Sequence, residues 1–209
     1  MRIAILGMGN VGSTLGRRWI EAGHQIVFGV RDPDKKRAEV EELQADLLPI
    51  PDAVAAADTV LLAVPMAAVP EVLKTAGDLS GKVLLDCTNP VTPELTHLTL
   101  GFTTSAGEEV AKRAPGAKVV KIFNTNGVGN MADPNYGDMK VTMLYAGDDD
   151  TANKRAAELA REIGMEPVWL GSLKEARLLE PLAMTWILLA RRRGLGQDFA
   201  LNIVHRPKR

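Results

Sequence analysis

The sequence predicts an α/β fold of the Rossmann type, a doubly wound and mainly parallel sheet with helices on both faces. Two observations lead to this expectation. Short apolar runs alternate with helical patterns through the first two-thirds of the 209 residues, which is typical of βαβ units. A glycine-rich stretch, Gly7–Met8–Gly9–Asn10–Val11–Gly12, also joins the first apolar run directly to the first helical pattern. The length suits a single domain over residues 1–209, with 172–209 as a helical extension of it.

The individual elements follow from periodicity and from the residues that end them. Strands are expected at residues 3–6, 25–30, 59–64, 82–87, 118–123, 141–146 and 167–170. Helices are expected at 13–22, 51–57, 69–76, 104–113, from the acidic group at 148–151 to 163, and at 174–192. Gly23 and Gly164 directly follow two of these helices, as helix-ending glycines do. Residues 127–140 are predicted to form a loop, and the tail from Gln197 one further helical turn.

Composition excludes several classes of protein. The net charge of −1 provides no basic field to hold nucleic acid or an anionic membrane. The longest apolar stretch, Leu182–Ala190, is too short to span a bilayer. The single cysteine, Cys87, rules out an internal disulfide and lies in an apolar run, so we expect a buried strand residue rather than a nucleophile. The scarcity of cysteine and the immediate start of a strand predict a cytoplasmic protein.

The glycine-rich stretch is a complete G-x-G-x-x-G motif in the context that a dinucleotide site requires. Gly7 is expected to permit the tight turn, Gly9 to let a pyrophosphate approach the backbone, and Gly12 to allow close packing of helix on strand. The backbone N–H groups of Asn10 and Val11 are expected to face the anion at the helix start. Residues 7–12, Met8 among them, are therefore predicted to bind a cofactor. A glycine turn without a ligand is the less favoured alternative.

The end of the second expected strand indicates which dinucleotide is bound. Proteins that bind NAD usually carry a carboxylate there, whereas this chain continues with Arg31 and, shortly after, Lys35, Lys36 and Arg37. Guanidinium and ammonium groups bind phosphate, so Arg31 and Lys35 favour NADP(H) over NAD(H). Asp32 leaves NAD open, because its carboxylate could approach the ribose or pair with Lys35.

Three further loops at strand C-termini are expected to line the same crevice. Val64, Pro65 and Met66 form the first, Asn89 and Pro90 follow the fourth strand, and Asn124 follows the fifth. Asn89 and Asn124 are candidates to hydrogen-bond the nicotinamide ribose or amide. Asparagine is also a standard turn residue, so each of the two roles remains open.

No set of residues for proton transfer or metal binding emerges, so we predict no catalytic residue. His24 and His205 lie away from the expected crevice, and His97 is the one histidine expected to be able to reach it. Asp86 and Glu180 read as isolated carboxylates, the first bonded to nearby backbone and the second beside Arg177. Oxidation of an alcohol needs a positioned base, whereas hydride exchange between NADPH and a flavin-like ring does not.

The chain resembles the NADPH-dependent oxidoreductases of the deazaflavin coenzyme F-420 (F420), a family of small dinucleotide-binding reductases. The likeness is carried by residues 5–12, 23–31, 86–90, 101–106, 121–125, 146–149, 171–173 and 178–182. The resemblance implies pyrophosphate contacts at Gly9, Asn10 and Val11, and 2′-phosphate contacts at Arg31 and Lys35. Two positions depart from it: Val30 stands where archaeal members tend to carry a phosphate-binding serine, and Asp32 where they carry a second basic residue.

The resemblance further implies a hydride acceptor and an assembly. The acceptor is F420, FMN, FAD or another redox molecule, and a C-terminal helix completes a small acceptor-pocket subdomain. A homodimer is implied, with the helix around Leu178–Leu189 near the acceptor pocket or the interface; core packing of Leu178, Leu182, Trp186 and Leu189 is the alternative. Two other functions stay open: an NADP-binding redox sensor or partner protein without turnover, and an imine or carbonyl reductase of the pyrroline-5-carboxylate reductase type.

Overall fold

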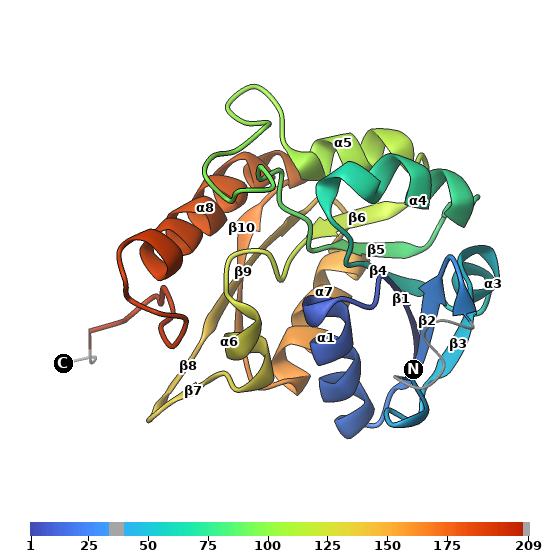
Figure 1. Ribbon diagram of the computed structural model, residues 1–209, viewed down its shortest axis with the longest axis horizontal. Helices are drawn as coiled ribbons and strands as arrows, with labels where there is room; N and C mark the ends of the chain where they lie inside the picture. The colour runs from blue at the N-terminus through green and yellow to red at the C-terminus, as the bar shows by residue number, and fades with distance from the viewer. Residues whose placement is uncertain (34–39, 207–209) are drawn as a thin grey trace.

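A computed structural model describes residues 1–33 and 40–206 of the chain, and its centre is one twisted sheet (Figure 1). The sheet strands are β1 (Arg2–Leu6), β2 (Gln25–Val30), β3 (Asp46–Pro49), β4 (Thr59–Leu62), β5 (Val83–Asp86), β6 (Lys118–Lys121), β9 (Thr142–Gly147) and β10 (Glu166–Gly171). Their spatial order is β10-β9-β6-β5-β4-β1-β2-β3. Neighbours pair in parallel except β6 with β9, which are antiparallel.

This strand order confirms the expected Rossmann fold and locates its crevice. From β3 to β6 the order is the 3-2-1-4-5-6 arrangement of dinucleotide-binding sheets, which reverses direction between β1 and β4. Ligands of open α/β sheets bind beyond the carboxyl ends of the strands at such a reversal. The glycine loop directly follows β1, so it lies at this point.

Helices cover both faces of the sheet, as Figure 1 shows. One face carries α1 (Asn10–Glu21), α6 (Val128–Ala132) and α7 (Asp150–Glu162); the other carries α3 (Ile50–Ala55), α4 (Val69–Ala76) and α5 (Ala106–Arg113). The strand β1 serves both layers, because Ile3 and Ile5 pack on the first face and Ala4 and Leu6 on the second. Such two-sided burial explains why the strands are continuously apolar.

The C-terminal part of the chain lies along α5 and β9. A short 3-10 turn, η3 (Leu173–Glu175), leads into α8 (Ala176–Arg192), which continues through Pro181. The buried face of α8 includes Leu179, Ala183 and Trp186. Of the four residues named for the core-packing alternative, Trp186 is buried, Leu182 and Leu189 are half-buried, and Leu178 is 59% exposed.

Three sequence expectations about local structure were wrong. Residues 127–140 are not a plain loop: they contain α6 and a small hairpin of β7 (Asn135–Tyr136) and β8 (Met139–Lys140). The strand β3 was missed because it is short and runs straight into α3 with no turn residue between them. The tail from Gln197 forms no helical turn within the described residues. It is held by contacts instead, since Phe199 stacks on Trp186 with ring centroids 5.2 Å apart.

Within residues 1–33 and 40–206, none of the helices combines the length and the apolar character that crossing a membrane would require.

Candidate functional site

The loop between β1 and α1 has the backbone geometry that its glycines were expected to give. Gly7 has φ of +108°, a conformation that residues with a Cβ rarely adopt. A Cβ on Gly12 would collide with the carbonyl oxygen of Gly7, so this glycine is needed for the close approach of α1 to the loop. At Gly9, by contrast, a Cβ would meet no protein atom within 4 Å, which leaves the space beside this backbone open to a ligand.

The start of α1 provides unpaired backbone donors at this loop. The N-cap residue is Gly9, which has no side chain to cap the helix, and the first turn holds no acidic residue. The first intrahelical bond runs from Ser13 N to Gly9 O, so the N–H groups of Asn10, Val11 and Gly12 have no acceptor within the helix. Such a helix start favours an anion through its N–H groups and its dipole.

A cleft of about 530 Å³ opens beside the glycine loop. It is lined by Gly7 and Met8, by the end of β2 from Gly29 to Asp32, and by Ile50, Val64, Pro65, Ala68, Glu71 and Val72. Five of the predicted site residues therefore come together here: Gly7, Met8, Arg31, Val64 and Pro65. The predicted site residue Lys35 lies outside the described residues, as do Lys36 and Arg37.

The predicted residues at the ends of β5 and β6 form a second group, outside the lining of that cleft. Asn89 donates from Nδ2 to the backbone oxygen of Asn124 (2.9 Å), and Asn124 donates from Nδ2 to Oδ1 of Asn89 (3.0 Å). Pro90 is buried next to them. Met66 follows Pro65 of the cleft lining, and its sulfur accepts a hydrogen bond from Oγ1 of Thr88, the residue before Asn89, at 3.9 Å. Met66 therefore links the cleft to the second group.

This asparagine pair leaves one buried acceptor unused. A backbone oxygen can only accept, so the bond to Asn124 O fixes the orientation of the Asn89 amide, and Asn89 Oδ1 then fixes that of Asn124. The remaining atom, Asn124 Oδ1, is buried and has no partner, and the same holds for the adjacent Thr125 Oγ1. Buried polar atoms are seldom left unpaired, so these two atoms indicate a place for a ligand group.

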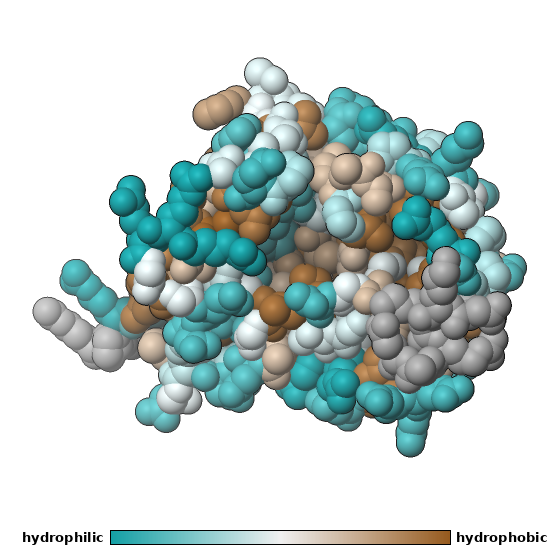
Figure 2. Space-filling model, viewed as in Figure 1, coloured by the Kyte–Doolittle hydropathy of each residue, from teal (hydrophilic) through white to brown (hydrophobic). Residues whose placement is uncertain are grey.

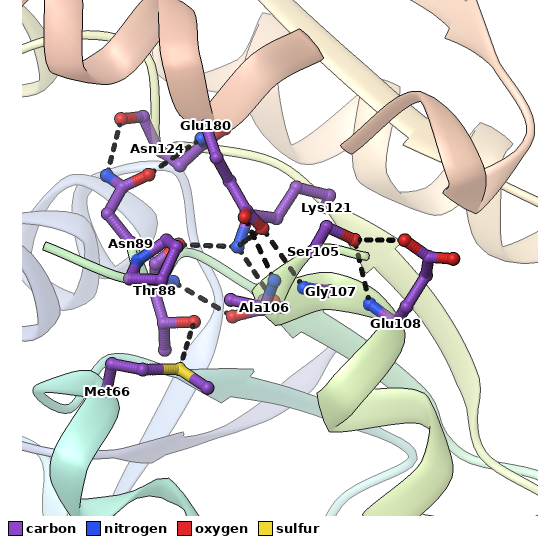
Figure 3. A network of polar contacts seen from close by, with 12 residues as sticks. Met66, Thr88, Asn89, Ser105, Ala106, Gly107, Glu108, Lys121, Asn124 and Glu180 are labelled. Atoms are coloured by element: carbon purple, nitrogen blue, oxygen red, sulfur yellow. Dashed lines mark hydrogen bonds and ion pairs between the residues drawn. The ribbon is translucent and has the colours of Figure 1, made fainter. Parts of the chain in front are cut away.

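A fully buried ion cluster lies beside this group of residues (Figure 3). Nζ of Lys121 is 3.0 Å from Oδ2 of Asp86 and 3.0 Å from Oε1 of Glu180, and it also donates to the backbone oxygen of Thr88. Burial by itself lowers the pKa of a lysine, but the two carboxylates outweigh it, so the pKa of Lys121 is raised. These three acceptors match the three protons on Nζ, so we assign Lys121 a structural role in holding the loop rather than a role in proton transfer.

The same cluster caps the start of α5. Glu180 accepts hydrogen bonds from Ala106 N (2.9 Å) and Gly107 N (3.0 Å). Ser105 Oγ accepts from Glu108 N, as an N-cap side chain does, and donates to the Glu108 carboxylate. Because the loop that carries Asn89 lies between β5 and α5, the cluster holds both ends of it.

These contacts correct the expectation for the carboxylates. Asp86 does bond to nearby backbone, at Thr88 N, but it is not isolated, and Glu180 does not contact Arg177. Arg177 instead donates two hydrogen bonds to Glu108 and lowers the pKa of that carboxyl. The sequence did hold a signal: Lys121, like Asp86, interrupts a buried apolar strand, and charges in such places must pair. In the sheet the two are register partners.

The other reactive side chains stand apart from the site. His97 is exposed, bonds to Thr96 Oγ1 and does not line the cleft beside the glycine loop; whether it reaches the nicotinamide end stays a prediction. His24 bonds to Glu162 and to the terminal amine, a structural role. Cys87 is only partly buried and follows β5 directly rather than lying in it; its Sγ donates to the backbone oxygen of Leu62, and desolvation raises the pKa of the thiol to about 12, which disfavours a thiolate. The described residues contain no His, Cys, Asp and Glu group able to hold a metal ion.

Comparison with known proteins agrees with this geometry. Residues 2–90 match the family model described as NADP oxidoreductase, coenzyme F420-dependent. The chain is 30% identical to the F420-dependent NADP reductase of Methanothermobacter thermautotrophicus, over 87% of this chain and 86% of that protein. It is also 30% identical to metalloreductase STEAP3 of Rattus norvegicus over 88% of this chain, but it spans only 36% of that protein's length.

A solved structure extends the likeness to the whole fold. The crystal structure of a protein from Arthrobacter sp. FB24, described as a candidate F420-dependent NADP reductase, superimposes with a TM-score of 0.89 at 31% identity. The match covers 98% of this chain and 100% of that one. It therefore includes α8 and the tail as well as the nucleotide-binding half.

Proposed function

This chain belongs to the family of F420-dependent NADP reductases, and we propose that it is an NADP(H)-dependent oxidoreductase that passes hydride directly to a deazaflavin or flavin acceptor. The observation that carries the proposal is the cleft at the glycine loop, which is lined by Gly7, Met8 and Arg31, while the uncapped start of α1 directly follows this loop in the chain. An uncapped helix start and an arginine at the end of β2 suit a dinucleotide that carries a pyrophosphate and a 2′-phosphate.

The adenosine half of NADP(H) is proposed to lie in the cleft. Gly9, Asn10, Val11 and Gly12 would receive the pyrophosphate through backbone N–H groups, and Arg31 would bind the 2′-phosphate. Support comes from the open space beside Gly9 and from the position of Arg31 at the end of β2, where dinucleotide-binding folds read the adenine ribose. Lys35 stays a predicted partner of the same phosphate. Met8, Val64, Pro65 and Met66 would provide the apolar walls.

The nicotinamide half is proposed to lie against Asn89, Pro90 and Asn124. The unused atom Asn124 Oδ1 is an acceptor, so the ligand group facing it must be a donor. The nicotinamide carboxamide and the ribose hydroxyls are donors of this kind, and Thr125 Oγ1 can pair with either. Phe123, just before Asn124, has φ of +60°, a strained conformation for an aromatic residue that is typical of positions held for function.

The chemistry requires little of the protein beyond positioning. When bound, NADPH supplies the hydride, and a flavin-like ring accepts it. Asp86, Lys121 and Glu180 hold the loop that carries Asn89; all three are fully buried, the lysine pairs with both carboxylates, and each bonds to backbone. They are therefore suited to hold the loop rigid rather than to exchange protons with a substrate. The face seen in Figure 2 is hollowed near its centre, with apolar side chains in the hollow, as stacked rings require.

The decisive experiment is NADPH oxidation with F420, FMN, FAD and ferric chelates as acceptors, in the unmodified protein and in Arg31→Ala. The ferric chelates are included because of the likeness to a metalloreductase. We expect turnover with one acceptor, and a rise in KM for NADPH in the variant with little change in kcat. Saturable NADPH binding without turnover on any acceptor would favour a redox sensor, and turnover of an imine instead would favour the imine reductase alternative.

Asn124→Ala tests the nicotinamide half separately. It removes the acceptor and one bond of the asparagine pair, so kcat is expected to fall while binding of 2′,5′-ADP, which lacks nicotinamide, stays unchanged. Thr104→Ala, at the α5 end of the loop, loses only a long hydrogen bond of 3.4 Å and serves as the control. Equal losses in both variants would refute the assignment.

A homodimer is also proposed. Leu178 on α8 and Trp169 on β10 are both more than half exposed, at 59% and 57%, and large exposed apolar side chains favour a protein interface. Sedimentation of the protein and of Leu178→Asp, expected to be a dimer and a monomer, tests this proposal.

A further inference from the structure

A carboxylate faces Arg31 across the mouth of the cleft. Glu71 lies in the first turn of α4, on the opposite wall from the end of β2. Its Oε2 is 4.0 Å from Nη1 of Arg31, and the two side chains are 68% and 75% exposed. Asp32, the neighbour of Arg31, lines the same cleft, so the described part of the lining contains two acidic side chains and one basic one.

The Glu71–Arg31 pair lies where the two nicotinamide dinucleotides are expected to differ, at the 2′ substituent of the adenine ribose. The 2′ substituent of the adenine ribose is read at the end of the second strand, by a carboxylate for a hydroxyl or by a basic group for a phosphate. Any anion bound by Arg31 lies within a few ångströms of Glu71, because the two side chains already meet there.

Resting on the proposed function, we propose that Glu71 is a specificity-determining residue that reduces the preference for NADP(H) over NAD(H). A 2′-phosphate competes with Glu71 for Arg31 and lies next to a like charge. A 2′-hydroxyl meets no such repulsion, and it can donate a hydrogen bond to the carboxylate. The same side chain therefore disfavours one dinucleotide and accommodates the other.

The expected change in 2′-phosphate affinity is small, because the side chains of Arg31 and Glu71 are both exposed. Water screens both side chains, so their interaction is in the range of surface ion pairs, which corresponds to about a two- to five-fold change in affinity. Salt must reduce the effect further, because the Debye length falls to about 8 Å at physiological ionic strength.

The test is Glu71→Gln, with Glu158→Gln as the matched control. Glu158 is an exposed glutamate on α7 that also faces an arginine, Arg155 at 3.7 Å, but it lies away from the cleft. Titration calorimetry at low salt would measure the binding of 2′,5′-ADP and of AMP, which differ in the 2′-phosphate. We expect Glu71→Gln to bind 2′,5′-ADP about two- to five-fold more tightly, with AMP unchanged or weaker, and the control to change neither.

The outcomes separate this inference from the proposed function. Fragment binding requires no acceptor, so the Glu71 effect stands or falls even if no turnover is found. An equal change for both fragments, or none for 2′,5′-ADP, would overturn the role of Glu71. Failure of the unmodified protein to bind either fragment would overturn the nucleotide site itself. With the acceptor in hand, the ratio of KM for NADH to KM for NADPH should rise in Glu71→Gln by the same factor.

Discussion

Replacing Lys121 by methionine should destabilise the protein more than any surface lysine substitution. The methionine fills most of the volume but removes the cation, which leaves Asp86 and Glu180 as two buried carboxylates without their counter-ion. Breaking a buried ion pair from one side typically costs about 3–5 kcal/mol, a large part of the roughly 5–15 kcal/mol that stabilises a domain. For a chain of this size the melting temperature should fall by roughly 6–20 °C.

The assay is urea unfolding followed by far-UV circular dichroism, with a lysine on the same strand as control. Lys118, also on β6, pairs with Asp149 at 3.1 Å, but the two side chains are 37% and 35% exposed. Lys118→Met should therefore cost less than about 1 kcal/mol. Adding Asp86→Asn to Lys121→Met should recover part of the loss, because one unpaired charge is then removed.

The pH dependence of unfolding gives a second test of the role of Lys121. The pKa of Lys121 is raised in the folded state, so its contribution is fully present below the ordinary lysine pKa and is lost as the pH rises through the raised value. The unmodified protein should lose stability at strongly alkaline pH by a step that Lys121→Met lacks. A loss for Lys121→Met no greater than for Lys118→Met would show that the buried carboxylates do not depend on the lysine, and the reasoning would fail.

Three further predictions concern other parts of the site. Gly9→Ala should raise KM for NADPH without lowering the melting temperature, because its Cβ meets no protein atom within 4 Å, whereas Gly12→Ala should lower the melting temperature by itself. Arg177→Met should lower the midpoint of urea unfolding at neutral pH, because charged hydrogen bonds to Glu108 are removed. The pKa of Glu108 is lowered, so the unmodified protein should lose this contribution only as the pH falls through that lowered value, and a difference that persists in acid would contradict this. Cys87 should react with a thiol reagent at neutral pH far more slowly in the native protein than after unfolding, since desolvation raises its pKa to about 12; equal rates in the two states would contradict this.

Much of the fold could be predicted from the sequence because local signals agreed with one another. The strand Gln25–Val30 and the helix Val69–Ala76 were predicted with the bounds that the structure shows. Gly23 after α1 and Gly164 after α7 adopt positive φ where helix ends were expected, since left-handed turns depend on neighbouring residues only. Short elements such as β3 and α6 escaped, because a few residues carry too little periodicity to identify.

In the candidate site, too, the local features could be predicted from the sequence, whereas the contacts between distant segments could not. The sequence by itself determined the glycine loop and the basic residue after β2, because both lie within one βαβ unit and each residue's role follows from its place there. It could not determine that Glu71 meets Arg31 or that Asn89 and Asn124 bond to each other. Those contacts depend on which strands are neighbours in the sheet.

Only the tertiary structure decided the buried cluster. Glu180 bonds to Ala106 and Gly107 over 74 and 73 residues, and Lys121 meets Asp86 over 35. In sequence each is a lone charge in an apolar stretch, and nothing local selects its partner. The physical reason is that a buried charge is tolerated only beside its counter-charge, so partners are chosen by the packing of whole elements, here β5, β6, α5 and α8.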